Sequence, residues 1–255
     1  MTIRIGIAGI TGRMGRLLAE EVPAAGAALA GGTLRSGAAP AGAAVLPDFG
    51  ALCGASDVVI DFTHAHVART HVQAAADSGT PLILGTSGLS ADDEAAVAEA
   101  AKRIPIVYAA NFAPGVNLFL AIAERMAAAL PPAQYDAEIV EMHHRQKVDA
   151  PSGTAVALGR AVAAGRGTTL EAAGKESGRD GHTGARGTGT IGFAALRGGQ
   201  VVGEHTLIFA AASEHISLTH RSFDRRVYAT GAVRAAVWAK GKAAGLYSMK
   251  DVLGM

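Results

Sequence analysis

The sequence is poor in cysteine and has no long apolar run. Its 255 residues include one cysteine, Cys53, so no disulfide can form within the chain, and a chain without disulfides is expected in a reducing compartment. No segment approaches the ~18 consecutive apolar residues that a membrane-spanning helix needs. The N-terminal stretch MTIRIGIAGI also lacks the apolar segment of a signal peptide. We therefore expect a soluble, cytoplasmic protein with no membrane partner.

An excess of charge of either sign is absent as well. The chain has 23 Lys and Arg residues against 22 Asp and Glu residues, which gives a formal net charge of +1. This balance favours neither nucleic acid nor an anionic membrane as a partner, so a local basic cluster is interpreted as a binding site. Hydrophobic residues make up 49% of the chain, enough for one large domain or two smaller ones.

Apolar runs typical of strands alternate with helical segments through residue 112. The expected strands cover 3–8, 27–34, 57–62, 81–84 and 105–112, and the expected helices cover 15–22, 66–79 and 91–103. This alternation predicts an α/β, Rossmann-like domain with a parallel sheet, which binds ligands at the carboxyl ends of its strands. The residues expected at that edge are Gly9–Gly15, Arg35, Phe62 and Thr63, Gly85–Ser87, and Asn111 and Phe112.

The pattern changes after Asn111. We expect a helix over 115–130, a strand over 135–144, a helix over 154–165, and three strands joined by turns between 190 and 222. These elements predict a second, α+β domain over 114–222 with an open mixed sheet. The segment 175–189 is expected to be a mobile loop or an excursion to a partner subunit. A last helix and the C-terminal tail, within 223–255, are expected to complete the first domain, 1–113.

A glycine-rich turn follows the first strand. Gly9, Gly12 and Gly15 stand between a predicted strand and a predicted helix, the context in which such a turn binds a dinucleotide. Without side chains, its backbone N–H groups can approach a pyrophosphate at the positive end of a helix. An ordinary strand–helix turn is the alternative, and the later glycine turn at Gly85 favours the dinucleotide.

The acid that holds the ribose of NAD is missing. No Asp or Glu occurs between Glu21 and Asp48, where such a residue is expected after the second strand. Arg13 lies in the glycine turn, and Arg35 follows the second strand. Guanidinium groups suit the 2′-phosphate of NADPH through paired hydrogen bonds. We therefore expect NADPH to be accepted at least as well as NADH.

The stretch EMHHRQKVDAPSGTA, 141–155, gathers titratable residues before a predicted helix start. Pro151 and Ser152 suit the first turn of a helix, which leaves the N–H groups of Gly153 and Thr154 as free donors at its positive end. His144, Arg145 and Lys147 add positive charge. This pattern predicts a pocket for a small substrate with more than one carboxylate.

His143 and Lys147 are the candidate proton donors in this stretch. Asp149 either orients Lys147 or caps the turn, and we favour the cap. A metal site is disfavoured because no acid or cysteine lies at ligand spacing and Lys147 and Arg145 would repel a cation; no metal is expected. A merely solvated loop fits poorly with the helix start that follows.

The segment EIVEMHHRQKVDAPSGTAVALG resembles the signature of bacterial 4-hydroxy-tetrahydrodipicolinate reductases, also called dihydrodipicolinate reductases. GIAGITGRMGR, VIDFTHA, LILGTSG, YAANFAPGVN, GTIGFAALRGG, VVGEHTLIFA and GLYSMKDVL resemble further family segments in the same order. The resemblance implies an NADPH- or NADH-dependent homotetramer of lysine and diaminopimelate biosynthesis, assembled through the open sheet of the second domain. Its substrate is then a small cyclic dicarboxylate.

The resemblance also implies roles for particular residues. His143 becomes the catalytic acid and base, Lys147 its partner donor, and His144, Gly153 and Thr154 ligands of the substrate carboxylates. The implied cofactor contacts are Gly9, Ile10, Thr11, Gly12, Arg13, Met14, Gly85, Thr86, Ser87, Ala109, Ala110, Asn111 and Phe112. Many members carry an acid just before the arginine equivalent to Arg35, and Leu34 stands here instead, a departure that favours NADPH.

Two other classes of protein share parts of this pattern. One is a different nicotinamide enzyme that acts on another small carboxylic acid, such as an amino-acid dehydrogenase, and a substrate panel separates the two. The other is a dinucleotide sensor without turnover. Proton donors beside an anion pocket argue against a sensor, which has no use for them.

Overall fold

The computed structural model describes all 255 residues of the chain as two compact units. Unit 1 comprises residues 1–114 and 226–255, and unit 2 comprises residues 115–225. No helix in either unit combines the length and the apolar character that crossing a bilayer requires.

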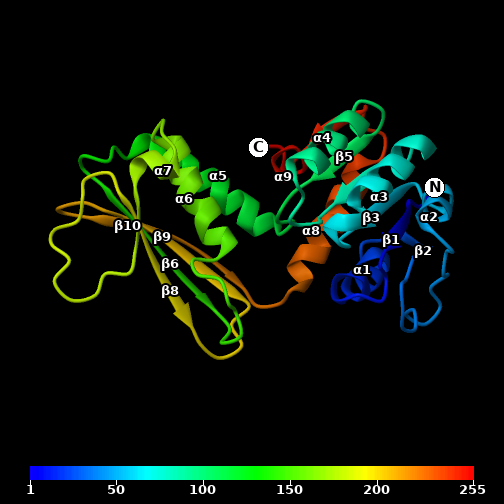
Figure 1. Ribbon diagram of the computed structural model, residues 1–255, viewed down its shortest axis with the longest axis horizontal. Helices are drawn as coiled ribbons and strands as arrows, with labels where there is room; N and C mark the ends of the chain where they lie inside the picture. The colour runs from blue at the N-terminus through cyan, green and yellow to red at the C-terminus, as the bar shows by residue number, and fades with distance from the viewer. The chain divides into compact units, whose positions relative to one another are not determined.

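Unit 1 is built on a six-stranded parallel sheet with strand order β11-β5-β4-β3-β1-β2 (Figure 1). The strands are β1 (Arg4–Ala8), β2 (Ala28–Gly32), β3 (Val58–Asp61), β4 (Leu82–Leu84), β5 (Pro105–Tyr108) and β11 (Gly245–Tyr247). The chain runs outward from β1 to β2 and then returns to build β3, β4 and β5 on the other side. The order therefore reverses between β1 and β3, where α/β sheets bind ligands.

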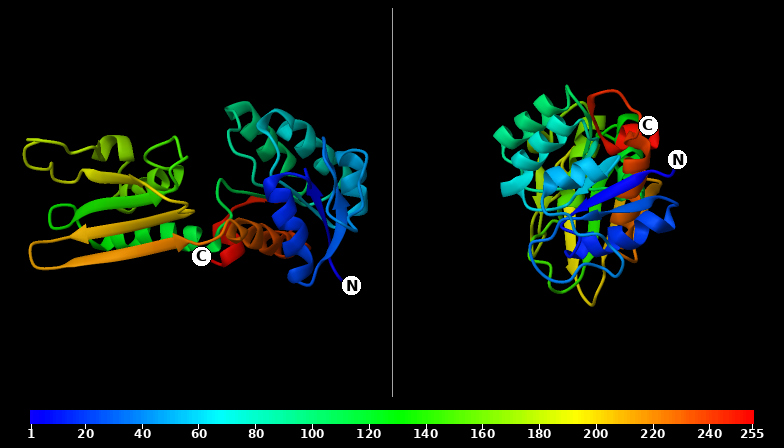
Figure 2. Two further views of the ribbon diagram at one scale, coloured as in Figure 1. Left: turned by 90° about the horizontal axis from the view of Figure 1, so that it is seen from below. Right: turned by 90° about the vertical axis from the view of Figure 1, so that its right-hand side faces the viewer.

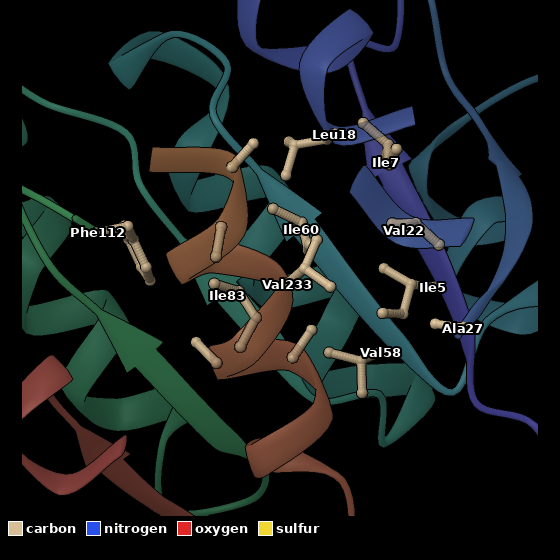
Figure 3. Close-up of a cluster of buried hydrophobic side chains, with 14 of the residues drawn as sticks. Ile5, Ile7, Leu18, Val22, Ala27, Val58, Ile60, Ile83, Phe112 and Val233 are labelled. Carbon is tan, nitrogen blue, oxygen red and sulfur yellow. The ribbon is translucent and has the colours of Figure 1, made fainter. Parts of the chain in front are cut away.

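Helices cover both faces of this sheet. They are α1 (Arg13–Ala24), α2 (Phe49–Ala55), α3 (Ala65–Ser78), α4 (Ala91–Ala100), α8 (Arg226–Ala239) and α9 (Met249–Leu253). Alternate residues of each strand point to opposite faces: Ile60 packs with α1 and α8, whereas Val59 packs with α2, α3 and α4. Figure 3 shows the first of these cores, with Val233 of α8 against Ile5, Ile60 and Ile83. Burial on both faces explains the continuous apolar strands.

Capping residues set several helix boundaries. Ser90 forms a capping box with Asp93 at the start of α4, and Gly79 ends α3 in the left-handed region at φ 68°, both as the sequence predicts. The predicted return of the tail is also confirmed, since β11 pairs with β5 and α9 packs on α8. Helix α2 lies in a segment for which the sequence predicts no helix. It is short, and its one start signal is Asp48, whose carboxylate accepts the Ala51 N–H at 2.8 Å.

Unit 2 is a five-stranded mixed sheet with order β10-β9-β6-β8-β7 and helices on one face (Figure 2). The strands are β6 (Asp136–His143), β7 (Lys175–Ser177), β8 (Ile191–Arg197), β9 (Gly203–Ala210) and β10 (His215–Ser222), and the helices are α5 (Pro114–Ala129), α6 (Gly153–Gly165) and α7 (Leu170–Ala173). Ile139, Phe193 and Leu207 form the core under these helices. The predicted fold class, a Rossmann-like domain with a second mixed-sheet domain, is confirmed.

Two expectations for unit 2 hold only in part. Consecutive strands joined by turns suggest antiparallel neighbours, and β9 and β10 do pair in this way. The strands β8 and β9 do not, because β6 lies between them and pairs with β8 in parallel and with β9 in antiparallel register. The loop at Gly198 and Gly199 therefore crosses the end of β6, where the Gly198 N–H donates to the His143 carbonyl at 3.0 Å. In the segment 175–189, the expected loop is found for residues 178–189 only. The segment begins with β7 and is held by Arg179 and Arg186, which form ion pairs with Glu138.

Candidate active site

The carboxyl ends of the strands of unit 1 gather the residues that the sequence predicts there. A Cβ atom on Gly9 would lie 3.0 Å from Thr63, and one on Gly85 would lie 2.3 Å from the ring of Phe62. The Phe62 and Phe112 rings pack with centroids 5.3 Å apart. The turns after β1, β3, β4 and β5 are therefore in contact, and the two glycines give their neighbours the room to approach.

The glycine turn leaves donors free. Thr33 holds the turn, because its carbonyl accepts the Ile10 N–H at 2.9 Å and its hydroxyl accepts the Gly9 N–H at 3.2 Å. The N–H groups of Thr11, Arg13 and Met14 have no backbone acceptor. Three unpaired donors at the start of α1 are the arrangement that binds a phosphate group.

Three arginines lie around this turn, and one of them has a structural role. Arg16 donates to the carbonyl oxygens of Thr11, at 3.2 Å, and Ala38, at 3.5 Å. Arg13 and Arg35 are exposed and form no hydrogen bond or ion pair within the chain. Their guanidinium groups are therefore available to a ligand.

The remaining predicted cofactor contacts lie on the turns after β4 and β5. Thr86 is buried, and its hydroxyl has no hydrogen-bond partner, whereas Ser87 and Ala110 are exposed. Ala109 extends β5 by donating to the Leu84 carbonyl. A buried hydroxyl without a partner calls for a polar ligand. Together with the free N–H groups of the glycine turn, it fits the phosphates and polar groups of a dinucleotide.

In unit 2, His143 ends β6 with one ring nitrogen fixed. Its Nδ1 lies 2.6 Å from Oε2 of Glu141, two residues earlier and on the same face of the strand. The other nitrogen, Nε2, has no hydrogen bond within the chain. A Cβ on Gly203, the neighbour on β9, would lie 3.0 Å from Nε2. The glycine therefore leaves this nitrogen accessible for proton transfer.

Glu141 is a buried carboxylate with every oxygen engaged. Arg197 donates to both oxygens, at 2.8 and 2.9 Å, and the Ser152 N–H donates to Oε1 at 3.0 Å. Burial alone would raise the pKa of Glu141, but the hydrogen bonds from Arg197, His143 and Ser152 outweigh it and hold the pKa below its usual range. Burial lowers the pKa of His143 despite the stabilising effect of Glu141 on the imidazolium. His143 is therefore mostly neutral in the free protein near pH 7.

A second buried histidine lies beside the first. The His205 and His143 rings meet edge to face with centroids 5.1 Å apart, and His205 Nε2 lies 3.0 Å from the Ser152 hydroxyl. That hydroxyl also accepts the Ala155 N–H and so caps α6, as predicted. Burial, and repulsion from His143 when that imidazole is protonated, lower the pKa of His205 to about 4, so His205 stays neutral near pH 7.

The side chain of Lys147 points to that of Asp149 in the same loop. Its ammonium lies 2.8 Å from Oδ1 of Asp149, and this contact lowers the pKa of the Asp149 carboxyl. The sequence favours a turn-capping role for Asp149, but its carboxylate forms an ion pair with Lys147. The pair limits the positions that the Lys147 ammonium can take.

The start of α6 presents the predicted donors. The N–H groups of Gly153 and Thr154 have no acceptor, since the cap satisfies only the N–H of Ala155 and the next bond begins at Val156. The half-buried His144 carries an Nδ1 with no partner. These groups form a set of donors suited to carboxylates.

Sequence reasoning missed Glu141, Arg197 and the contact of His205 with Ser152. A signal for Glu141 was present, because Glu-x-His on a strand places both side chains on one face. Arg197 and His205 carry no such signal. They reach the site only because β8 and β9 flank β6, with Arg197 in register with His143 and His205 in register with Glu141.

Comparisons with known proteins cover the whole chain. The family model described as "Dihydrodipicolinate reductase, N-terminus" matches residues 3–112, and "Dihydrodipicolinate reductase, C-terminus" matches residues 115–253. A 4-hydroxy-tetrahydrodipicolinate reductase of Granulibacter bethesdensis is 65% identical over 100% of this chain and 98% of its own. One of Gluconacetobacter diazotrophicus is 63% identical over 99% and 98%.

Solved structures show the same fold. A dipicolinate-bound dihydrodipicolinate reductase from Paenisporosarcina sp. TG-14 superposes with a TM-score of 0.80 at 24% identity, over 97% of this chain and 98% of its own. A probable dehydrogenase from Thermotoga maritima superposes with a TM-score of 0.61 at 12% identity, over 98% and 92%.

The buried state of His205 predicts how stability depends on pH. Because the folded protein disfavours the charged imidazole, the unfolded chain binds more protons below pH 6.5. The stabilisation is complete above pH 6.5 and is lost as the pH falls toward about 4, with a total on the order of 3 kcal/mol. We expect His205→Gln to reduce the slope of unfolding free energy against pH in this window, measured by urea denaturation. The same slope in wild type and variant would contradict this, and His215→Gln, at an exposed position, is the control.

Proposed function

Because the chain belongs to the dihydrodipicolinate reductase family, it is a nicotinamide-dependent reductase of the diaminopimelate route to lysine, and we propose which residues carry its reaction. The family reduces 4-hydroxy-tetrahydrodipicolinate to tetrahydrodipicolinate. A bound nicotinamide dinucleotide supplies the hydride. The chain itself must bind a cyclic dicarboxylate, orient it and deliver a proton.

The unpaired N–H groups at the start of α6 carry the substrate proposal. Gly153 and Thr154 offer two backbone donors and one hydroxyl at the positive end of a helix, and His144 offers an unpartnered ring nitrogen. We propose that this set holds the substrate carboxylates. The solved relative that carries dipicolinate, a cyclic dicarboxylate, supports a ligand of this class.

His143 and Lys147 are the proposed proton donors. Loss of the 4-hydroxyl group as water gives a conjugated imine. Addition of hydride to C4 of this imine then gives an enamine, which needs a proton at the adjacent carbon. His143 is mostly neutral in the free protein, but two substrate carboxylates near it favour the imidazolium and raise its pKa. Binding of the substrate therefore favours protonation of His143, which then donates this proton to the enamine. The Lys147 ammonium is the second proton donor.

Removal of either donor should slow turnover. We expect His143→Ala and Lys147→Ala each to lower kcat by about 10²-fold or more, the usual effect of losing a positioned acid. The assay couples the condensation product of aspartate semialdehyde and pyruvate to oxidation of NADPH or NADH. Near-normal turnover in both variants would refute the assignment.

The carboxylate clamp should act on binding. Thr154→Val removes one hydroxyl donor and keeps the shape and the backbone N–H, so we expect a higher KM for the substrate with little change in kcat. An effect limited to kcat would contradict a role in anchoring the carboxylate. Steady-state kinetics at saturating cofactor distinguishes the two results.

We propose that Arg13 and Arg35 bind the 2′-phosphate of NADPH. Both are exposed without partners, and no acid lies near the end of β2 to bind a ribose hydroxyl. Arg35→Ala should raise KM for NADPH by about tenfold, the loss of one charge-assisted contact, and leave KM for NADH unchanged. A strong preference for NADH that Arg35→Ala does not alter would reject the proposal.

We propose that the chain forms a homotetramer in the cytoplasm through the open face of the β6–β10 sheet. Val140, Met142, Leu196 and Ile208 lie on the face opposite the helices, and Leu196 is 51% exposed, an apolar surface typical of an interface. The free, buried Cys53 fits a reducing compartment.

Sedimentation should show a species with the mass of four chains. Leu196→Arg should dissociate it, because a charge would be buried in the apolar interface, whereas Val237→Arg, at an exposed position of α8, should not. A monomeric wild type would rule out the assembly.

A further inference from the structure

Arg197 contacts two points of the stretch 141–155 at once. Its guanidinium donates to both carboxylate oxygens of Glu141, and Nη2 also donates to the backbone carbonyl of Asp149 at 2.6 Å. A further bond from Nη1 reaches the carbonyl of Leu196. One side chain on β8 therefore fixes a carboxylate on β6 and the loop that follows it.

Glu141 and Asp149, the two residues that Arg197 anchors, each contact one proposed proton donor through a side-chain carboxylate. Glu141 holds Nδ1 of His143 at 2.6 Å, and the Asp149 carboxylate holds the ammonium of Lys147 at 2.8 Å. The contacts form a continuous chain from Lys147 through Asp149, Arg197 and Glu141 to His143. The two donors stand at its ends, and the guanidinium stands in the middle.

We infer that Arg197 is a positioning residue for both proton donors, holding His143 through Glu141 and Lys147 through Asp149. This inference rests on the proposed roles of His143 and Lys147. The planar guanidinium suits the task, because its donors have fixed directions and can bind a carboxylate with two parallel bonds. Glu141 is 1% exposed, so it depends on this partner rather than on water for its negative charge.

The charges around His143 predict a signature in the pH profile. Glu141 on β6 raises the pKa of His143, and burial together with Lys147 and Arg197 lowers it. The other titratable group in contact with His143 is the neutral His205 on β9. Asp149 lies beyond Lys147, and His220 on β10 lies beyond His205. Loss of Glu141 and loss of Arg197 should therefore move the titration of His143 in opposite directions.

Four variants test this. The alkaline limb of the kcat profile is the fall in kcat as His143 loses its proton. In Glu141→Gln this limb should move to lower pH by about one unit, because the carboxylate that stabilises the His143 imidazolium is gone. In Arg197→Gln, the limb should move to higher pH, because a repelling cation is gone, and kcat should fall at least about tenfold through misplaced donors. Arg197→Lys keeps the charge without the planar fork, so the limb should stay in place while kcat falls. KM for NADPH should not change in any of them.

The fourth variant, Arg103→Gln, is the control. It removes an arginine from an exposed ion pair with Asp77 in unit 1 and should leave the profile unchanged. Equal limbs in wild type, Glu141→Gln and Arg197→Gln, with kcat reduced in each, would show a purely structural role and overturn the inference. If Arg197→Gln does not fold, Arg197→Lys alone tests position 197, and a normal kcat in it would overturn the inference. If Glu141→Gln does not fold, Glu141→Asp replaces it. Shortening the side chain withdraws the carboxylate from Nδ1, and a limb that does not move to lower pH would also overturn the inference.

The proposed roles and this inference can fail separately. If His143→Ala and Lys147→Ala keep turnover, the donors themselves are wrongly assigned. If both lose turnover but the limbs of the Glu141 and Arg197 variants do not move, the donors stand and the positioning role of Arg197 is refuted.

Discussion

A buried carboxylate is the constraint around which unit 2 is organised. Glu141 lies on β6 with almost no access to water, so its charge must be balanced by groups of the chain. Arg197 from β8, the backbone N–H of Ser152 at the start of α6, and His143 from β6 provide that balance. Three elements are thus held to one another at the point where the site lies. Removal of any one of these partners would leave the buried negative charge of Glu141 incompletely compensated.

The same arrangement accounts for the chemistry of the site. Because Ser152 supplies both an N–H to Glu141 and the cap of α6, the next two N–H groups, of Gly153 and Thr154, remain free for an anion. Because Glu141 occupies Nδ1 of His143, the free nitrogen is Nε2. In this short segment, the hydrogen bonds that stabilise the fold also determine which donors remain free for a ligand.

Much of the fold follows from sequence signals that act locally. The strands of unit 1 are apolar because both faces of the sheet are covered, and Ser90 and Gly79 mark helix ends through contacts with residues nearby in the chain. The glycine turn and the helix start at Ser152 are equally local, so both could be recognised with the residues they expose. Helix α2 could not be predicted because a single capping residue and a few small residues give too weak a signal.

Sheet order could not be predicted in the same way. The turn at Gly198 and Gly199 resembles a hairpin, yet β6 inserts between the strands it joins. That insertion depends on pairing between residues more than fifty positions apart, including the register of His143 with Arg197. When such pairing brings a charged side chain to the site, the residues next to it in the sequence give no indication of its role. Arg197 and His205 were missed for this reason.

We propose that the basic site of unit 2 binds a dicarboxylate and takes up a proton as it does so. Calorimetry of dipicolinate binding, repeated near pH 7 in buffers with different ionisation enthalpies, measures the protons taken up. The account predicts uptake approaching about one proton, because the ligand's charge raises the pKa of His143, and no uptake in His143→Gln. Binding without proton uptake in the wild type, or equal uptake in both proteins, would contradict it.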